Sequence, residues 1–256
     1  MKETTIEVRG APVRALEAGT GAPVLYLHGI DGPRPDPLVA ELAKSHRVIV
    51  PELPGFGRSP IPDWLMDISD AASFGLDLVD ALGVGRLHLA GHSIGGWIAA
   101  EMAIRDAALF PSLSLLAPMG VTPAEPPEFD VFIPSPDAVL RAQFHDAALA
   151  EAEIAARAGE DIDIVLQNRM GLARLGWSPR FARVQLPHWL HRAKMPALIL
   201  WGEKDRVVPI DCLDVFAREM PRAETARFAG CGHAIPFERG ADAARRVAAF
   251  IAGAVR

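Results

Sequence analysis

Short apolar runs alternate with segments of helical periodicity over the first part of the chain. Strand-like runs cover residues 5–9, 13–16, 23–27, 47–50, 86–90 and 113–116. Helical patterns lie between the later runs, at residues 36–44, 67–82 and 97–105. Apolar strands separated by helices are typical of a mostly parallel sheet with helices on its faces. The pattern therefore predicts an α/β protein.

This alternation stops after the sixth strand-like run. The interval of residues 121–193 opens with several prolines and continues with helix-favouring stretches at residues 138–157 and 162–175. Strand-like runs then return at residues 196–201 and 224–228, with helical patterns at residues 211–219 and 241–254. We predict an eight-stranded, mostly parallel sheet in a core domain of residues 1–120 and 194–256. Residues 121–193, called the lid segment below, are expected to form a helical lid inserted after strand 6.

Composition narrows the possible partners. The 256 residues are 50% hydrophobic and 23% charged, and the formal net charge of −6 comes with scattered lysines and arginines. This balance is typical of a globular enzyme and argues against a nucleic-acid partner. The first residues lack a secretory signal, and no apolar run approaches the ~18 residues that cross a bilayer. We expect a cytoplasmic protein without membrane contact, with Cys212 and Cys231 as reduced thiols, and a homodimer remains possible.

A glycine-flanked serine stands between a predicted strand and a predicted helix. The segment Gly91-His92-Ser93-Ile94-Gly95 fits the G-x-S-x-G nucleophile elbow, a sharp strand-to-helix turn that projects the serine hydroxyl from the sheet. A serine between glycines also occurs in ordinary turns. The apolar strand before it and the apolar helix after it favour the elbow, so Ser93 is the candidate nucleophile.

A serine nucleophile needs a base and a group that orients the base. Asp205 follows the apolar run 196–201, and His233 follows the run 224–228. The chain order serine, aspartate, histidine is the order expected on this scaffold. Glu203 competes with Asp205 for the acidic role, but we expect Glu203 to be solvated. Catalytic roles are therefore assigned to Ser93, Asp205 and His233.

Two backbone N–H groups are candidates for stabilising a developing oxyanion. Ile94 follows the nucleophile at the start of a helix, and Ile30 lies in the loop after the third strand. Gly29 allows this loop to approach closely, although the loop could also be a plain turn. His28 is interpreted as a structural hydrogen-bonding group at a strand end, and His92 is expected to pack with its side chain pointing away from the serine.

These residues together resemble the α/β-hydrolase superfamily over nearly the whole chain. The matching segments are residues 27–29, 54–59, 91–95, 201–205 with Pro209, and 232–233. The chain is similar to a lid-bearing branch that includes carboxylesterases and meta-cleavage product hydrolases, which cut carbon–carbon bonds in dienoic acids. This resemblance implies an α/β-hydrolase fold and a reaction that needs no cofactor or metal.

The resemblance also indicates substrate contacts. Residues 166–169 look like the segment that carries a substrate-contacting arginine in the carbon–carbon hydrolases, which places Arg169 near a substrate carboxylate. Gly29, Trp177 and Ala234 are further candidates for substrate binding. The carbon–carbon hydrolases usually have tryptophan after the catalytic histidine, whereas this chain has Ala234.

The sequence therefore predicts a serine hydrolase that opens a carboxylic ester or a related carbonyl compound through an acyl-enzyme. We expect the lid segment to be apolar with few fixed charges. Such a lid indicates a small-molecule substrate with a hydrophobic portion. A carbon–carbon bond hydrolase is the first alternative. A ligand receptor or a cofactor-free perhydrolase on the same scaffold also remains open, because both share the catalytic residues.

Overall fold

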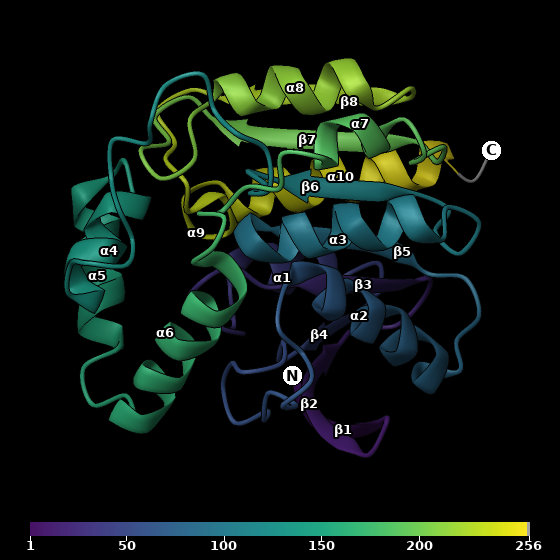
Figure 1. Cartoon of the computed structure of the whole chain (residues 1–256), viewed down its shortest axis with the longest axis horizontal. Coiled ribbons are helices and arrows are strands. Elements are labelled where there is room, and N and C mark those ends of the chain that lie inside the picture. The colour runs from purple at the N-terminus through teal and green to yellow at the C-terminus, as the bar shows by residue number, and fades with distance from the viewer. Residues whose placement is uncertain (255–256) are drawn as a thin grey trace.

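The computed structural model describes residues 1–254, and its centre is one eight-stranded sheet (Figure 1). The strand order is β1-β2-β4-β3-β5-β6-β7-β8. The pairings β1–β2 and β2–β4 are antiparallel, and the others are parallel. The strands are β1 (Lys2–Val8), β2 (Ala11–Ala18), β3 (Pro23–Leu27), β4 (Arg47–Pro51), β5 (His88–His92), β6 (Leu113–Leu116), β7 (Ala197–Gly202) and β8 (Ala223–Phe228). The predicted mostly parallel eight-stranded sheet is confirmed.

Helices cover both faces of the sheet. One face carries α1 (Pro37–Leu42), α9 (Ile235–Glu238) and α10 (Gly240–Ala254), which contact one another (Figure 1). The other face carries α2 (Ile68–Leu82), α3 (Ser93–Arg105), α7 (Leu186–Leu190) and α8 (Asp211–Glu219). Because β3, β5, β6 and β7 have helices on both faces, their residues are buried almost throughout, which is why they read as continuous apolar runs in the sequence.

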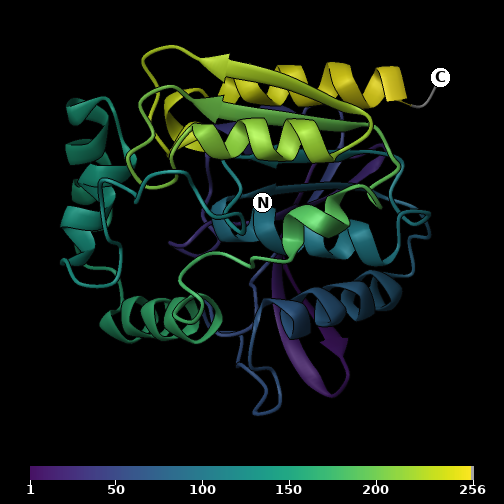
Figure 2. The ribbon, with the colours of Figure 1, turned by 45° about the horizontal axis from the view of Figure 1, so that its top comes forward.

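Three helices stand beside one end of the sheet rather than on its faces (Figure 2). They are α4 (Pro136–Gln143), α5 (Ala147–Ala156) and α6 (Ile162–Gly176), and they fall between β6 and β7 in the chain. Helix α7 belongs to the same interval but packs against α3 and α8 on the sheet face. The division into a core domain and a lid remains a prediction.

Some local expectations were wrong. The helix expected from residue 97 begins at Ser93, directly after β5. The stretch at residues 138–157 is helical as expected, but it is divided into two helices, because Phe144 is extended and Asp146 caps a new helix by accepting from Ala148 N–H and Leu149 N–H. The lid segment also carries more fixed charge than expected. Its ion pairs include Arg141–Glu151, Arg157–Glu153 and Arg180–Asp130.

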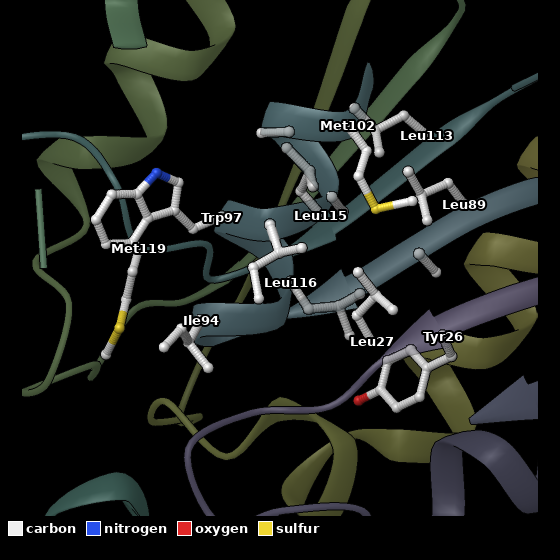
Figure 3. Close-up of a cluster of buried hydrophobic side chains, with 14 of the residues drawn as sticks. Tyr26, Leu27, Leu89, Ile94, Trp97, Met102, Leu113, Leu115, Leu116 and Met119 are labelled. Carbon is white, nitrogen blue, oxygen red and sulfur yellow. The ribbon is translucent and has the colours of Figure 1, made fainter. Parts of the chain in front are cut away.

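The core holds the loops at one end of the parallel strands in place. Side chains of β3, β5 and β6 meet those of α3 in a continuous buried cluster, which includes Leu27, Leu89, Ile94 and Leu116 (Figure 3). The loops after β3, β5, β7 and β8 leave the same edge of the sheet, because these strands run parallel. Among the helices within residues 1–254, none combines the length and the apolar character that crossing a membrane requires.

Candidate active site

Ser93 lies at the turn between β5 and α3, in a backbone conformation that a serine rarely adopts. Its φ is 58°, and its side chain is fully buried. A Cβ on Gly91 would lie 2.4 Å from the carbonyl oxygen of Gly95, and a Cβ on Gly95 would lie 2.4 Å from that of Leu27. Such contacts are impossible without moving backbone, so the two glycines are required by close packing. A serine at positive φ costs about 1–3 kcal/mol, which the surrounding core offsets.

The side chains of Ser93, His233 and Asp205 form a continuous chain of hydrogen bonds. The Ser93 hydroxyl donates to His233 Nε2 at 2.8 Å, and His233 Nδ1–H donates to Asp205 Oδ2 at 2.7 Å. The carboxylate accepts only, so it holds the ring proton on Nδ1 and leaves Nε2 free to take a proton from the serine. Both the His233 and the Asp205 side chains are fully buried. The structure thus brings together the three residues predicted to be catalytic, which are called the triad below.

Asp205 is itself held in place by the loop that follows β7. Its Oδ1 accepts from the backbone N–H groups of Val207 and Val208, both at 2.8 Å. These bonds leave Oδ2 for His233. Glu203, the competing carboxylate, is exposed to solvent, as expected from the sequence.

The loop after β3 approaches the nucleophile closely. A Cβ on Gly29 would lie 3.4 Å from Ser93 Cβ and 2.6 Å from His92 Nδ1. The Gly29 carbonyl accepts from His28 Nδ1–H at 2.7 Å and from Gly32 N–H at 3.3 Å. This carbonyl shares a peptide plane with the Ile30 N–H, so its two donors fix the direction of that N–H. The oxyanion-hole role of Ile30 remains a prediction.

Ile94 supplies the other predicted oxyanion donor. It is the second residue of α3, and the first N–H groups of a helix have no acceptor within the helix. The helix dipole also favours negative charge at this end. The side chain of Ile94 is fully buried in the core, which holds its backbone rigidly beside Ser93. Its role as a donor likewise remains a prediction.

Two other histidines, His28 and His92, form hydrogen bonds next to the site. His28 accepts from Leu53 N–H through Nε2 at 3.0 Å, so the expectation of a structural role at a strand end is confirmed. His92 is hydrogen-bonded through its Nε2–H to the His233 carbonyl at 2.8 Å, with the two rings 4.9 Å apart. From the sequence, only packing is expected of His92. Its adjacency to the nucleophile gave no signal of this contact, because the partner is 141 residues away.

The four candidate substrate-binding residues separate into two groups. Gly29 borders Ser93, and Ala234, 2% exposed, follows His233 and donates its N–H to the Gln143 carbonyl at 2.9 Å. Arg169 instead donates to the Phe132 carbonyl at 2.8 Å, within the lid segment. Trp177 is 56% exposed and lies against the Phe132 ring and the Arg180 guanidinium. The structure therefore places Arg169 and Trp177 against the lid segment's own residues rather than against the triad.

A largely apolar pocket of about 310 Å³ is lined by residues that contact the triad, although no triad residue is among its lining residues. Its walls include Met119, whose N–H donates to the Ser93 carbonyl at 3.1 Å, and Val207 and Val208, which hold Asp205. One end carries the ion pair of Asp130 and Arg180. Other lining residues include Val121, Phe129, Val131, Phe181 and several prolines. Within residues 1–254 no cluster of three His, Cys, Asp or Glu side chains is arranged to hold a metal ion.

Burial of histidines, two beside the site and one at the opposite end of β5, predicts acid sensitivity. Burial lowers the pKa of His28 and of His88 to about 4, and that of His92 to about 3, from 6.5. The unfolded chain protonates these rings near pH 6.5 while the folded protein keeps them neutral, so acid favours the unfolded state. The free energy of unfolding should fall between about pH 6.5 and 4, by up to about 1.4 kcal/mol per pH unit for each of His28 and His92.

One buried carboxyl acts in the opposite direction. Burial raises the pKa of Asp36 to about 7 from 3.8, so the folded protein keeps a proton that the unfolded chain releases. Because three histidines oppose one carboxyl, the net fall persists. Urea unfolding at pH 6.5, 5.5 and 4.5 measures it, and His88→Asn should flatten the curve. An unfolding free energy that stays constant from pH 6.5 to 4.5 would contradict this expectation.

Comparison with known proteins agrees with this geometry. The model of the alpha/beta hydrolase family matches residues 24–250. A 2-hydroxy-6-oxononadienedioate/2-hydroxy-6-oxononatrienedioate hydrolase of Burkholderia vietnamiensis is 29% identical over 231 residues, covering 80% of this chain and 76% of that protein. The chain therefore belongs to the alpha/beta hydrolase family.

Solved structures show the same fold. A bacterial membrane phospholipase A is 27% identical, with a TM-score of 0.79 over 100% of this chain and 87% of that chain. A meta-cleavage product hydrolase from Pseudomonas fluorescens is 23% identical, with a TM-score of 0.85 over 98% of both chains. The second likeness bears on the fold alone.

Proposed function

We propose that the protein is a serine hydrolase that cleaves carboxylic esters through an acyl-enzyme. The observation that carries this proposal is the buried chain of hydrogen bonds from the Ser93 hydroxyl through His233 to Asp205. A serine in hydrogen-bond reach of a histidine, which a carboxylate orients in turn, is the arrangement that generates an alkoxide-like nucleophile. Two predicted oxyanion donors beside it fit acyl transfer.

The reaction proceeds in two halves. His233 Nε2 takes the proton of Ser93 as Oγ attacks the carbonyl carbon, and the oxygen that becomes negative is held by the N–H groups of Ile30 and Ile94. His233 then gives its proton to the leaving alcohol, and the acyl group remains on Ser93. A water molecule deprotonated by His233 attacks this acyl-enzyme, which releases the carboxylic acid and returns the proton to Ser93.

The largely apolar pocket supports a substrate with a hydrophobic acyl group. Its volume of about 310 Å³ suits a small organic group, and its lining is mainly valine, proline, phenylalanine and methionine. The structurally similar protein is named as a phospholipase A, and phospholipases A cleave carboxylic esters. We propose that the acyl chain lies between Met119 and the Val207–Val208 segment.

A series of p-nitrophenyl esters tests the proposal. The value of kcat/KM should rise up to about four-fold with each added methylene until the pocket is filled, since burying one methylene contributes about 0.8 kcal/mol. Val121→Phe should lower kcat/KM for the longer esters and leave the acetate ester nearly unchanged, and activity on acetate also shows that the variant is folded. A chain-length profile that Val121→Phe does not alter would remove the pocket from the proposal, and an absence of multiple turnover on every ester would favour a receptor.

Cleavage of a carbon–carbon bond is a second candidate, since the similar protein of Burkholderia vietnamiensis is named as a hydrolase of dienedioates. The contact of Arg169 with the Phe132 carbonyl does not favour carbon–carbon cleavage. An arginine held there does not bind the carboxylate of a dienoic acid. A 2-hydroxy-6-oxo-dienoic acid in the same panel discriminates the two. Faster turnover of this acid than of any ester would reverse the order of the candidates.

We also propose a cytoplasmic location. The buried, unpaired thiols of Cys212 and Cys231 support it, since free thiols are usual in reducing compartments.

A further inference from the structure

Three side chains of the lid segment converge on one residue of the loop after β3. Gln143, at the end of α4, donates through Nε2 to Asp31 Oδ2 at 2.9 Å. Arg157, which caps α5, places Nη1 3.3 Å from Asp31 Oδ1. Asn168, within α6, donates through Nδ2 to the Asp31 carbonyl at 3.1 Å. Every acceptor atom of Asp31 is thus held by a different element of the lid segment.

The three side chains of the lid segment are shielded from solvent in these contacts, whereas the Asp31 side chain is 26% exposed. Gln143 is 2% exposed and Asn168 is 8% exposed. The Arg157 side chain is 12% exposed. Asn168 is fixed from its other side, because its Oδ1 accepts from Gly57 N–H at 2.7 Å. Leaving a buried amide or charge without a hydrogen-bond partner destabilises the protein. The arrangement therefore favours the one loop position in which all of these partners are present.

Asp31 occupies the turn that also carries the Ile30 N–H. Residues 29–32 form a tight turn, which is closed by the hydrogen bond from Gly32 N–H to the Gly29 carbonyl. His28 holds the first peptide of this turn from the core, and the lid segment holds Asp31 at its far side. The direction of the Ile30 N–H therefore depends on contacts with both parts of the protein.

A second set of ion pairs joins the same loop to the lid segment. Arg34 lies 3.2 Å from Glu153 and 2.8 Å from Glu160, and Glu153 also pairs with Arg157 at 3.0 Å. The lid segment thus contacts this loop at two successive points, Asp31 and Arg34.

We propose that Asp31 is a positioning residue through which the lid segment aligns the oxyanion hole of the ester hydrolysis proposed above. Ile30 N–H points at the reacting carbonyl oxygen only while Gln143, Arg157 and Asn168 hold the turn. Docking of the lid segment and stabilisation of the transition state are coupled in this way. A lid segment displaced from Asp31 leaves the triad intact and the hole misaligned.

Two ketone inhibitors separate this effect from substrate binding. An alkyl trifluoromethyl ketone accepts Ser93 Oγ at its carbonyl carbon, and the proton passes to His233 while the carbonyl oxygen becomes an oxyanion. The matching methyl ketone occupies the site mainly without this addition. The first inhibitor therefore reports on the oxyanion hole, and the second reports on the pocket.

The experiment uses Asp31→Ala, with Glu151→Gln as a matched control that breaks an exposed ion pair elsewhere in the lid segment. Asp31→Ala should lower kcat on the best ester about 10- to 100-fold with KM nearly unchanged, because a misaligned donor affects the transition state most. The inhibition constant of the trifluoromethyl ketone should rise by a similar factor, and that of the methyl ketone should not. Glu151→Gln should leave all four values as in the wild type.

Two further variants separate a loss of alignment from a general loss of folding. Gln143→Glu places a second carboxylate against Asp31 and should reproduce the loss, whereas the double variant Gln143→Glu with Asp31→Asn restores a donor–acceptor pair and should recover much of kcat. Equal weakening of both ketones, or unchanged kcat in Asp31→Ala, would overturn the proposal while the hydrolase function stands. A wild type that neither turns over esters nor binds the trifluoromethyl ketone would overturn both.

Discussion

Replacement of Ser93 by alanine should lower kcat on an activated ester by at least about 10⁴-fold, because the acyl-enzyme cannot form without the hydroxyl. His233 and Asp205 remain in place in this variant, but they have no nucleophile to activate. The fold should survive, since alanine removes one buried oxygen and keeps the Cβ that the elbow already accommodates. Steady-state hydrolysis of a p-nitrophenyl ester measures the loss, and mass spectrometry after an acylating inhibitor should find no adduct.

Ser73→Ala is the matched control, because Ser73 is an exposed serine on α2 whose hydroxyl donates to the Ser69 carbonyl one turn earlier. It should retain full activity. If Ser93→Ala keeps more than a small fraction of the wild-type rate while Ser73→Ala behaves as expected, the nucleophile lies elsewhere.

Substitution of Asp205 by asparagine should lower kcat by about 10⁴-fold. The carboxylate holds the His233 proton on Nδ1, whereas an amide that turns its NH₂ toward the ring favours the proton on Nε2, where the base must be free. The amide oxygen can still accept from Val207 N–H and Val208 N–H, so the loop should keep its shape. Thermal unfolding is the measurement that separates loss of the base from loss of the fold.

Glu203→Gln serves as the control for Asp205, because Glu203 is a carboxylate two residues away that faces solvent. The pair also decides between the two acids considered from the sequence. A large loss in Glu203→Gln together with a small one in Asp205→Asn would reverse the assignment of the acid.

Local sequence was sufficient where one segment determines the geometry. The elbow around Ser93 could be predicted because a strand, a glycine-flanked serine and a helix follow one another without interruption. Ser93, Asp205 and His233 could be grouped because each follows a predicted strand of a mostly parallel sheet and because their chain order is the one expected on this scaffold. Even there the start of α3 was misplaced, since the periodicity of the helix becomes visible only after its glycines.

Contacts between distant segments could not be predicted in the same way. The convergence of Gln143, Arg157 and Asn168 on Asp31 joins residues more than 100 positions apart. Helical geometry could have indicated that the side chains of Asn168 and Arg169 point about 100° apart. Because Asn168 is buried, Arg169 does not point the same way. The break between α4 and α5 depends on Glu238, whose carboxylate accepts from His145 N–H and Asp146 N–H and lies outside the lid segment.

The backbone conformation of Ser93 has a consequence for the stability of the protein. Glycine adopts a φ near 58° without steric cost, so the sequence that would relax this turn most is one that cannot perform acyl transfer. The backbone strain at Ser93 is present in the folded protein whether or not substrate is bound. A glycine at this position would relieve the strain but would remove the hydroxyl that the proposed hydrolysis requires, so stability and the proposed activity make opposite demands on this residue.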